Sequence, residues 1–224
     1  MDLTSVFLSL KIASVAVAVV FLIALPLARV TARRHFPGKD IFEAVLVLPL
    51  VLPPSVVGFF LLYLLGRTGP LGYFLESNFD IQVVFTWVGA VTAAAVVAFP
   101  LMYRPLKSSI EEVDERLEQA ARVLGAGELK IFWTVTLPLA WPGLVAGVVM
   151  AFTRALGEFG ATLIVAGNIP GRTQTMPLAI YQAIETGEME QVLGLVLFLT
   201  LFSFIVVLFS NRWTRKKRLQ LEGR

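Results

Sequence analysis

The chain has 224 residues and a formal net charge of +3; 57% of its residues are hydrophobic, 16% are charged, and its mean hydropathy is +0.78. Soluble domains carry about 25% charged residues, so this composition excludes an ordinary soluble protein and indicates an all-α integral membrane protein. The net charge is too small to indicate a nucleic-acid partner, and with no cysteine and a single histidine, His35, we expect neither a cofactor nor a metal ion.

Five apolar segments are each long enough to cross a lipid bilayer, which takes about 20 residues in a helix. They cover residues 4–28, 44–65, 81–103, 142–167 and 192–210. Together they predict a single transmembrane domain over residues 4–210. We interpret the basic tail at 211–224 as a cytoplasmic anchor of the topology.

Basic residues are distributed unevenly between the loops. They gather in the loop after the first segment, in the loop after the third segment, and in the tail. The other two loops hold one each, Arg67 and Arg172. Because positive residues collect on the cytoplasmic side of a membrane protein, we expect the N-terminus outside and the C-terminus in the cytoplasm. An odd number of spans agrees with this orientation.

The second segment contains three prolines, Pro49, Pro53 and Pro54, and the last is followed by Ser55. Each proline removes a backbone donor, so this helix is expected to kink or break. A broken helix persists in a membrane only where neighbouring protein or a water-filled cavity satisfies the freed groups. Two interpretations follow: Pro53, Pro54 and Ser55 line a translocation path, or the segment is a kinked packing helix.

The loop over residues 105–140 contains a predicted amphipathic helix. Apolar side chains recur at spacings of three and four from Ile110 to Leu124, with acidic side chains between them, and Gly125 is well placed to end the helix. The helix narrows to Ala120 and Ala121, which suits insertion into a groove on another protein. The alternative is a helix on the membrane surface, but such helices carry bulky apolar residues and lysines.

This loop resembles the EAA loop of ABC-importer permeases, which has the pattern E-A-A-x3-G-x9-I-x-L-P. The matching positions here are Gln119, Ala120, Ala121, Gly125, Val135, Leu137 and Pro138. Gln119 replaces the glutamate of the pattern, with Glu118 one residue earlier, and Val135 replaces the isoleucine. The resemblance implies that this set, Glu118 included, forms the loop that couples the chain to an ATPase.

Arg154 and Glu158 lie inside the fourth apolar segment, in the stretch RALGEFGAT. On one continuous helix they share a face with small residues, while bulky residues such as Leu156 lie opposite. The small residues of that face are Gly143, Gly147 and Ala151. We therefore expect the charged face to look into the protein and the bulky face to look into lipid.

Two roles for this pair stay open. In the first, the two charges neutralise each other and the pair locks the bundle or a dimer interface. In the second, Arg154 lines the route of a divalent oxyanion, and Glu158 moderates how tightly the anion is held. If the helix breaks at Gly157 or Gly160, the residues on either side of the break no longer share the faces that one continuous helix would give them.

The resemblance covers nearly the whole chain. The stretches that carry it are FPGKD (36–40), LPLVLPPSVVG (48–58), LEQAARVLGAG (117–127), RALGEFGAT (154–162) and GNIPGRTQTMPLAIY (167–181). They are similar to the molybdate-permease family and, less closely, to its sulfate and thiosulfate relatives. The resemblance implies the type I ABC-importer architecture in a bacterial or archaeal inner membrane. It also implies a homodimer, a cytoplasmic ATPase dimer and an extracytoplasmic oxyanion-binding protein.

The chain lacks the G-x-x-x-x-G-K-[ST] motif that holds the phosphates of a nucleotide. We therefore expect a transport subunit without an ATPase site of its own, served by a separate nucleotide-binding subunit. The predicted cargo is molybdate, with tungstate or sulfate as alternatives, since all are tetrahedral dianions. An ion-coupled secondary transporter is the rival class, but it usually shows internal repeats, and we find none. A membrane enzyme would need catalytic groups that the spans lack.

Overall fold

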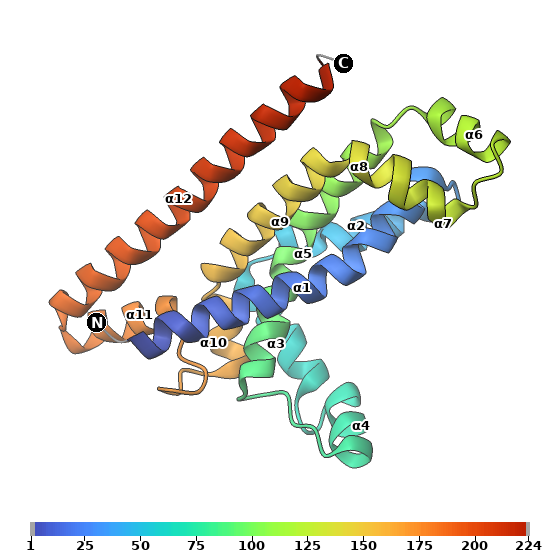
Figure 1. Ribbon diagram of the computed structural model, residues 1–224. Coiled ribbons are helices and arrows are strands. Elements are labelled where there is room, and N and C mark those ends of the chain that lie inside the picture. The colour runs from blue at the N-terminus through green and yellow to red at the C-terminus, as the bar shows by residue number, and fades with distance from the viewer. Residues whose placement is uncertain (1–2, 223–224) are drawn as a thin grey trace.

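The computed structural model describes residues 3–222 as an elongated bundle of helices, with no strand among these residues (Figure 1). Three helices pack against one another at its centre: α1 (Leu3–Arg33), α5 (Trp87–Glu111) and α9 (Trp141–Leu156). Their contacts are rich in buried alanine and glycine, which let membrane helices approach closely. Examples are Ala13, Ala16, Ala24, Ala94, Ala98 and Ala151.

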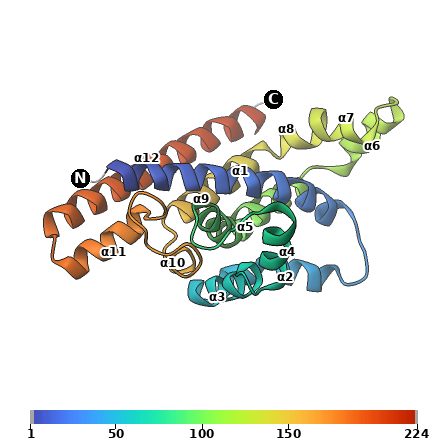
Figure 2. The same ribbon diagram turned by 90° about the horizontal axis from the view of Figure 1, so that it is seen from below.

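The remaining elements surround these three. They are α2 (Lys39–Val51), α3 (Pro54–Leu65), α4 (Pro70–Phe79), α6 (Glu115–Val123), α7 (Glu128–Ile131), the π-helical turn η1 (Phe132–Thr136), α8 (Leu137–Leu139), α10 (Gly160–Ala166), α11 (Met176–Thr186) and α12 (Met189–Glu222). Helix α12 lies at the edge of the bundle, against α9 and α11. Helices α6 and α7 form a protrusion at one end (Figures 1 and 2).

Three described helices are long and apolar enough to cross a membrane: α1, α5 and residues 189–209 of α12. Two bent pairs bring the number to five if each pair is one span. These are α2 with α3, bent by 114°, and residues 128–139 with α9, bent by 74°. Counted in this way, the number equals the five expected from the sequence, although the fourth span then covers residues 128–156 in place of the predicted 142–167.

The helices do not begin and end where the predicted spans do. The first helix continues to Arg33, and α12 runs from Met189 through Glu222 with no interruption at residue 210; residues 223–224 of the predicted tail lie outside the described residues. The third helix starts at Trp87 rather than residue 81, because the Thr86 side chain caps it by accepting from the Gly89 N–H at 3.4 Å. It ends at Glu111 instead of residue 103.

The expected break in the second segment is confirmed. Helix α2 ends at Val51, and α3 begins at Pro54 after the extended residues Leu52 and Pro53. Proline is tolerated at the first position of a helix, because its missing N–H would have no partner there. Pro49 lies inside α2 and does not end it.

The fourth segment is not the single helix that we expected. Helix α9 ends at Leu156, residues 157–159 are not helical, and α10 begins at Gly160. The Glu158 side chain stabilises the new start, since its Oε1 accepts from the Ala161 N–H at 2.8 Å. A carboxylate near a helix N-terminus is favourable because its negative charge faces the positive end of the helix dipole and because it accepts from a backbone N–H that has no partner within the helix.

The predicted amphipathic helix of the loop is also shorter than expected. Ile110 belongs to the end of α5, and a separate helix α6 starts only at Glu115. The division occurs because the Asp114 side chain accepts from the Arg116 N–H at 2.9 Å and so caps a new helix.

Candidate functional site: two adjoining helix breaks and a protruding loop

The breaks of the second and fourth segments lie side by side. Helices α3 and α10, which begin directly after these breaks, pack together. A Cβ placed on Gly160 would be 3.1 Å from the Pro54 Cβ, and one on Gly58 would be 3.0 Å from the Ala161 Cα. Glycine at these two positions therefore allows the close approach. Ser55, beside Pro54, is exposed.

The Arg154–Glu158 pair spans the break in the fourth segment. Arg154 Nη1 lies 2.7 Å from Glu158 Oε2, and the exposed fractions of the two side chains are 28% and 1%. Arg154 stands in the last turn of α9, where a cation is favourable, and Glu158 precedes α10, where an anion is favourable. The pair thus stabilises both helix ends, and the guanidinium remains partly accessible.

The small residues of the fourth segment are buried, as the expected inward face requires. Gly143, Gly147 and Ala151 all lie against the bundle. The expectation for the opposite face is wrong at Leu156, which is buried with 2% of its surface exposed. This residue ends α9 beside the break, where other parts of the chain cover it in place of lipid.

We expect Gly147→Ala to destabilise the protein. A Cβ at this position would lie 2.9 Å from the Met102 carbonyl oxygen, so α9 and α5 must separate, at a cost of about 1–3 kcal/mol. Thermal unfolding of the purified protein in detergent measures the effect. Gly194→Ala in α12 is the matched control: nothing lies within 4 Å of its added Cβ, and alanine should stabilise that helix by about 0.5–1 kcal/mol. A rise in melting temperature for both variants would contradict the close packing.

A second polar region lies between α2 and α5. Lys107 Nζ is 2.7 Å from Glu43 Oε2 and 3.4 Å from Glu111 Oε1. The adjoining cavity of about 620 Å³ is lined by these three residues and also by Asp40 and Arg104. Three carboxylates against two bases make it a poor place to hold an anion. We interpret it as a connection between the second and third spans.

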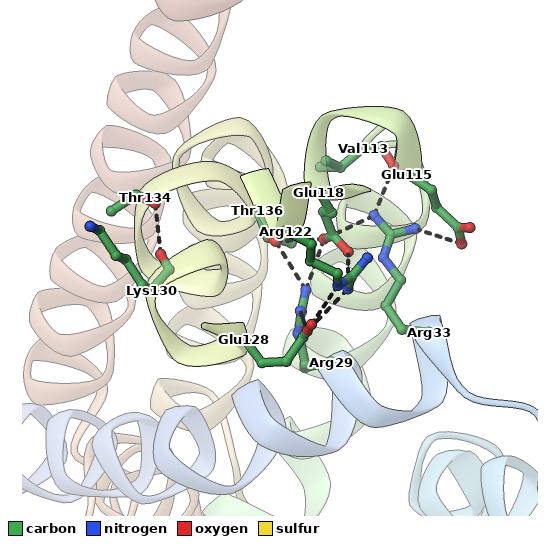
Figure 3. Close-up of polar contacts among 10 residues, drawn as sticks. All are labelled: Arg29, Arg33, Val113, Glu115, Glu118, Arg122, Glu128, Lys130, Thr134 and Thr136. Atoms are coloured by element: carbon green, nitrogen blue, oxygen red, sulfur yellow. Dashed lines mark hydrogen bonds and ion pairs between the residues drawn. The ribbon is translucent and has the colours of Figure 1, made fainter. Parts of the chain in front are cut away.

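The protruding loop is organised around a buried carboxylate (Figure 3). Glu118 is 2% exposed. Its Oε1 accepts hydrogen bonds from Thr136 Oγ1 at 2.6 Å and from Arg29 Nη1 at 2.9 Å, and it lies 3.4 Å from Arg33 Nη2. The two arginines come from the C-terminal end of α1, and Thr136 comes from η1.

These contacts set the ionisation of Glu118. Burial by itself raises the pKa of the carboxyl, but hydrogen bonds from Thr136 and Arg29 and the charges of Arg29 and Arg33 outweigh it. The pKa therefore lies below the ordinary value of 4.5. A lowered pKa means that the stabilisation is fully present above pH 4.5 and is lost only as the pH falls below that value. Glu118 is thus charged at neutral pH.

Gly125 ends α6 as expected. Its φ is +80°, in the left-handed region that glycine adopts without strain. The Gly125 N–H donates to the Arg122 carbonyl at 2.9 Å, and the Ala126 N–H donates to the Ala121 carbonyl at 3.0 Å. This is the Schellman arrangement that closes many helices.

The other predicted coupling residues divide into covered and accessible ones. Leu137 is buried and Ala121 is half-buried, whereas Gln119, Ala120 and Pro138 are exposed. Beside them lie large apolar side chains with exposed fractions between 73% and 88%. We call this set the apolar tip: Val123, Leu124 and Leu129. Leu124 belongs to the apolar pattern read from the sequence, whereas Val123 and Leu129 were not predicted to form a surface with it.

Three partners of Glu118 were also missed. Arg29 and Arg33 were interpreted only as part of the basic loop, and Thr136 was not considered. No local spacing connects residues so far apart along the chain. The signal in the sequence was a group of acidic residues at 111–118 set against the basic residues of the loop after the first segment. In the described part of the chain, no group of three or more metal-binding side chains comes together.

The sequence is similar to known membrane transport proteins. The family described as "Binding-protein-dependent transport system inner membrane component" matches residues 7–218. The chain is 45% identical to the "Molybdenum transport system permease protein" of Haemophilus influenzae, over 97% of this chain and 95% of the relative. The protein of the same description from Escherichia coli K12 is 44% identical, over 98% and 96%.

Solved structures show the same fold. The bacterial ABC transporter involved in import of the acidic polysaccharide alginate aligns with a TM-score of 0.74 at 15% identity, covering 96% of this chain and 79% of that one. The MetNI methionine ABC transporter aligns with a TM-score of 0.72 at 19% identity, covering 95% and 94%. The chain therefore belongs to the family of inner membrane components of binding-protein-dependent transport systems.

Proposed function

We propose that this protein is the membrane-spanning permease subunit of an ATP-driven ABC importer that carries molybdate into the cytoplasm. The observation that supports this most strongly is the identity of 44–45% with molybdenum transport permeases over nearly the full length of both chains. Sulfate transport permeases are related over less of their length: 41% identity over 79% of this chain and 61% of the Synechococcus elongatus relative. Molybdate is therefore the first candidate.

The transporter would contain two copies of this chain, a cytoplasmic ATPase dimer and an extracytoplasmic binding protein that delivers the anion. The lack of a nucleotide-binding motif in the chain supports a separate ATPase. The apolar tip supports its place of docking, because an exposed apolar patch on a protrusion marks a surface that binds another protein. The unequal distribution of basic residues supports a cytoplasmic position for this loop.

The proposed mechanism is alternating access. ATP brings the two halves of the ATPase together, the docked α6 helices approach each other, and the paired bundles open outward to receive the anion. Hydrolysis reverses the movement. The two adjoining helix breaks support a path in this part of the bundle, since irregular backbone in a membrane belongs where it lines a cavity or is buried in protein.

The test is to purify the permease with its ATPase and to reconstitute the complex in proteoliposomes. ATP hydrolysis is measured with the binding protein loaded in turn with molybdate, tungstate or sulfate. We expect molybdate to stimulate hydrolysis and to enter the vesicles only when ATP is present. Uptake of molybdate without the ATPase subunit, or stimulation by sulfate alone, would contradict the proposal.

A further inference from the structure

Charged side chains hold helix α6 to the rest of the chain: Glu118 and Glu115 lie 2.9 Å and 3.4 Å from the α1 arginines Arg29 and Arg33. Among the nine residues of α6, all of which the structure describes, Glu118 is the one that is buried. The apolar residues around it face solvent; Leu117 is 48% exposed and Val123 is 88% exposed. The usual means of holding a helix, an apolar face against the core, is therefore weak here.

We propose that Glu118 is a positioning residue that fixes α6 to the C-terminal end of α1, so that a displacement of α6 moves α1 with it. The proposal rests on the proposed function, in which the ATPase displaces α6. It adds a route by which that displacement enters the bundle. The route is separate from the covalent connection of α6 to α5 and α7.

The contacts of Glu118 support a rigid attachment. Its Oε1 accepts from two elements at once, from Arg29 on α1 and from Thr136 on η1. Sliding or rotation of α6 alone would break these bonds and leave the buried Glu118 carboxylate without its counter-charges, which is strongly unfavourable. Charge-assisted bonds of this kind are also stronger than neutral ones.

The arginines hold more than Glu118, as Figure 3 shows. Arg33 Nη2 donates to the Val113 carbonyl at 2.7 Å, just before α6 begins. Arg29 Nη2 lies 3.5 Å from Glu128 Oε2 on α7, and its guanidinium lies 5.0 Å from the centre of the Phe132 ring. The end of α1 thus contacts the turn before α6, the helix itself and the segment after it.

Helix α1 is well placed to pass such a movement on. It packs along both α5 and α9, and its buried face includes small residues with no exposed surface, such as Ala13, Ala16 and Ala28. Close-packed interiors have low compressibility and transmit displacement. A movement of the C-terminal end of α1 therefore shifts the central three helices together.

The first test is Glu118→Gln in the reconstituted complex. Glutamine keeps the size and an acceptor oxygen but removes the charge that holds both arginines. We expect molybdate uptake per ATP hydrolysed to fall about fivefold or more, a typical size for coupling between sites, while ATP hydrolysis continues. Glu112→Gln is the matched control: it makes the same chemical change at an exposed position of the same loop, and should keep the wild-type ratio.

The second readout is the distance between spin labels at Val30 on α1 and Arg116 on α6, both exposed positions. In the wild-type complex we expect one narrow distribution that is the same with and without ATP. In Glu118→Gln we expect a broad distribution that changes on ATP binding. This readout reports attachment directly and does not depend on the cargo.

The outcomes separate this proposal from the proposed function. If the wild-type complex shows no ATP-driven uptake, the proposed function fails. If the wild type transports and Glu118→Gln keeps both the wild-type ratio and the narrow distribution, the positioning role is overturned. Should Glu118→Gln not yield a complex, Thr136→Val replaces it, since it removes the two hydrogen bonds of the Thr136 hydroxyl, to Glu118 and from Arg29, and no charge. If Thr136→Val keeps the wild-type ratio of molybdate uptake to ATP hydrolysed, the positioning role of Glu118 is likewise overturned.

Discussion

We expect the replacement Leu124→Asp to abolish docking of the ATPase while the permease remains inserted in the membrane. Leu124 is 87% exposed in the apolar tip. In the proposed complex, an aspartate there would be buried against the ATPase without a partner, at a cost of about 3–5 kcal/mol. That corresponds to docking weaker by about a hundredfold or more. The measurement is the amount of ATPase that copurifies with each permease.

The control is Leu71→Asp, at an exposed leucine on α4, a helix that Figure 1 shows well apart from α6 and α7. It introduces the same charge, and the amount of copurified ATPase should equal that of the wild type. Equal ATPase recovery with Leu124→Asp would contradict docking at the tip. It would instead favour the alternative in which this loop lies on the membrane surface.

The parts of the fold that the sequence predicted correctly depend on local chemistry. The break at Pro53 follows from the missing N–H and the fixed φ of proline, which act wherever they occur. The end of α6 at Gly125 follows from the left-handed conformation that glycine accepts. The number of apolar segments follows from bilayer thickness.

The break in the fourth segment could not be predicted so directly. Gly157 and Gly160 are both tolerated within a membrane helix, and a spacing of four between Arg154 and Glu158 also fits a continuous helix. The segment breaks because Gly160 packs closely against Pro54 and because Glu158 caps α10. Neither contact is visible in a pattern of residues.

The coupling loop shows the same limit. Arg29 and Glu118 are 89 positions apart, and Thr136 is 107 positions from Arg29. Their meeting depends on how α1 passes the end of α5, which no spacing encodes. The resemblance to the EAA pattern led to the loop and placed Gln119, which is exposed, at the position of the pattern's glutamate; Glu118, which the predicted set also included, is the buried residue of the two.

The second large effect is expected at Arg154 and Glu158. Removal of either partner alone should reduce assembly of the complex, because it leaves an uncompensated charge at a cost of about 3–5 kcal/mol. Glu158→Ala should be the more damaging change. This change leaves Arg154 without its counter-charge and also removes the acceptor for the Ala161 N–H.

The double replacement Arg154→Met with Glu158→Gln separates packing from transport. Glutamine keeps an oxygen for the Ala161 N–H, and methionine fills much of the arginine volume, so we expect assembly to recover. We also expect molybdate uptake per recovered complex to stay low. The reason is that the guanidinium, 28% exposed beside two helix breaks, is a positive charge placed to meet a dianion.

Two quantities are measured for the wild type, the two single variants and the double variant: the amount of complex recovered, and the molybdate uptake per complex. Non-additive assembly would measure the pair itself, as a double-mutant cycle requires. If the double variant assembles and also transports like the wild type, Arg154 has no part in the path. The pair is then a device that holds the ends of α9 and α10 together, and the route of the anion must be sought elsewhere in the bundle.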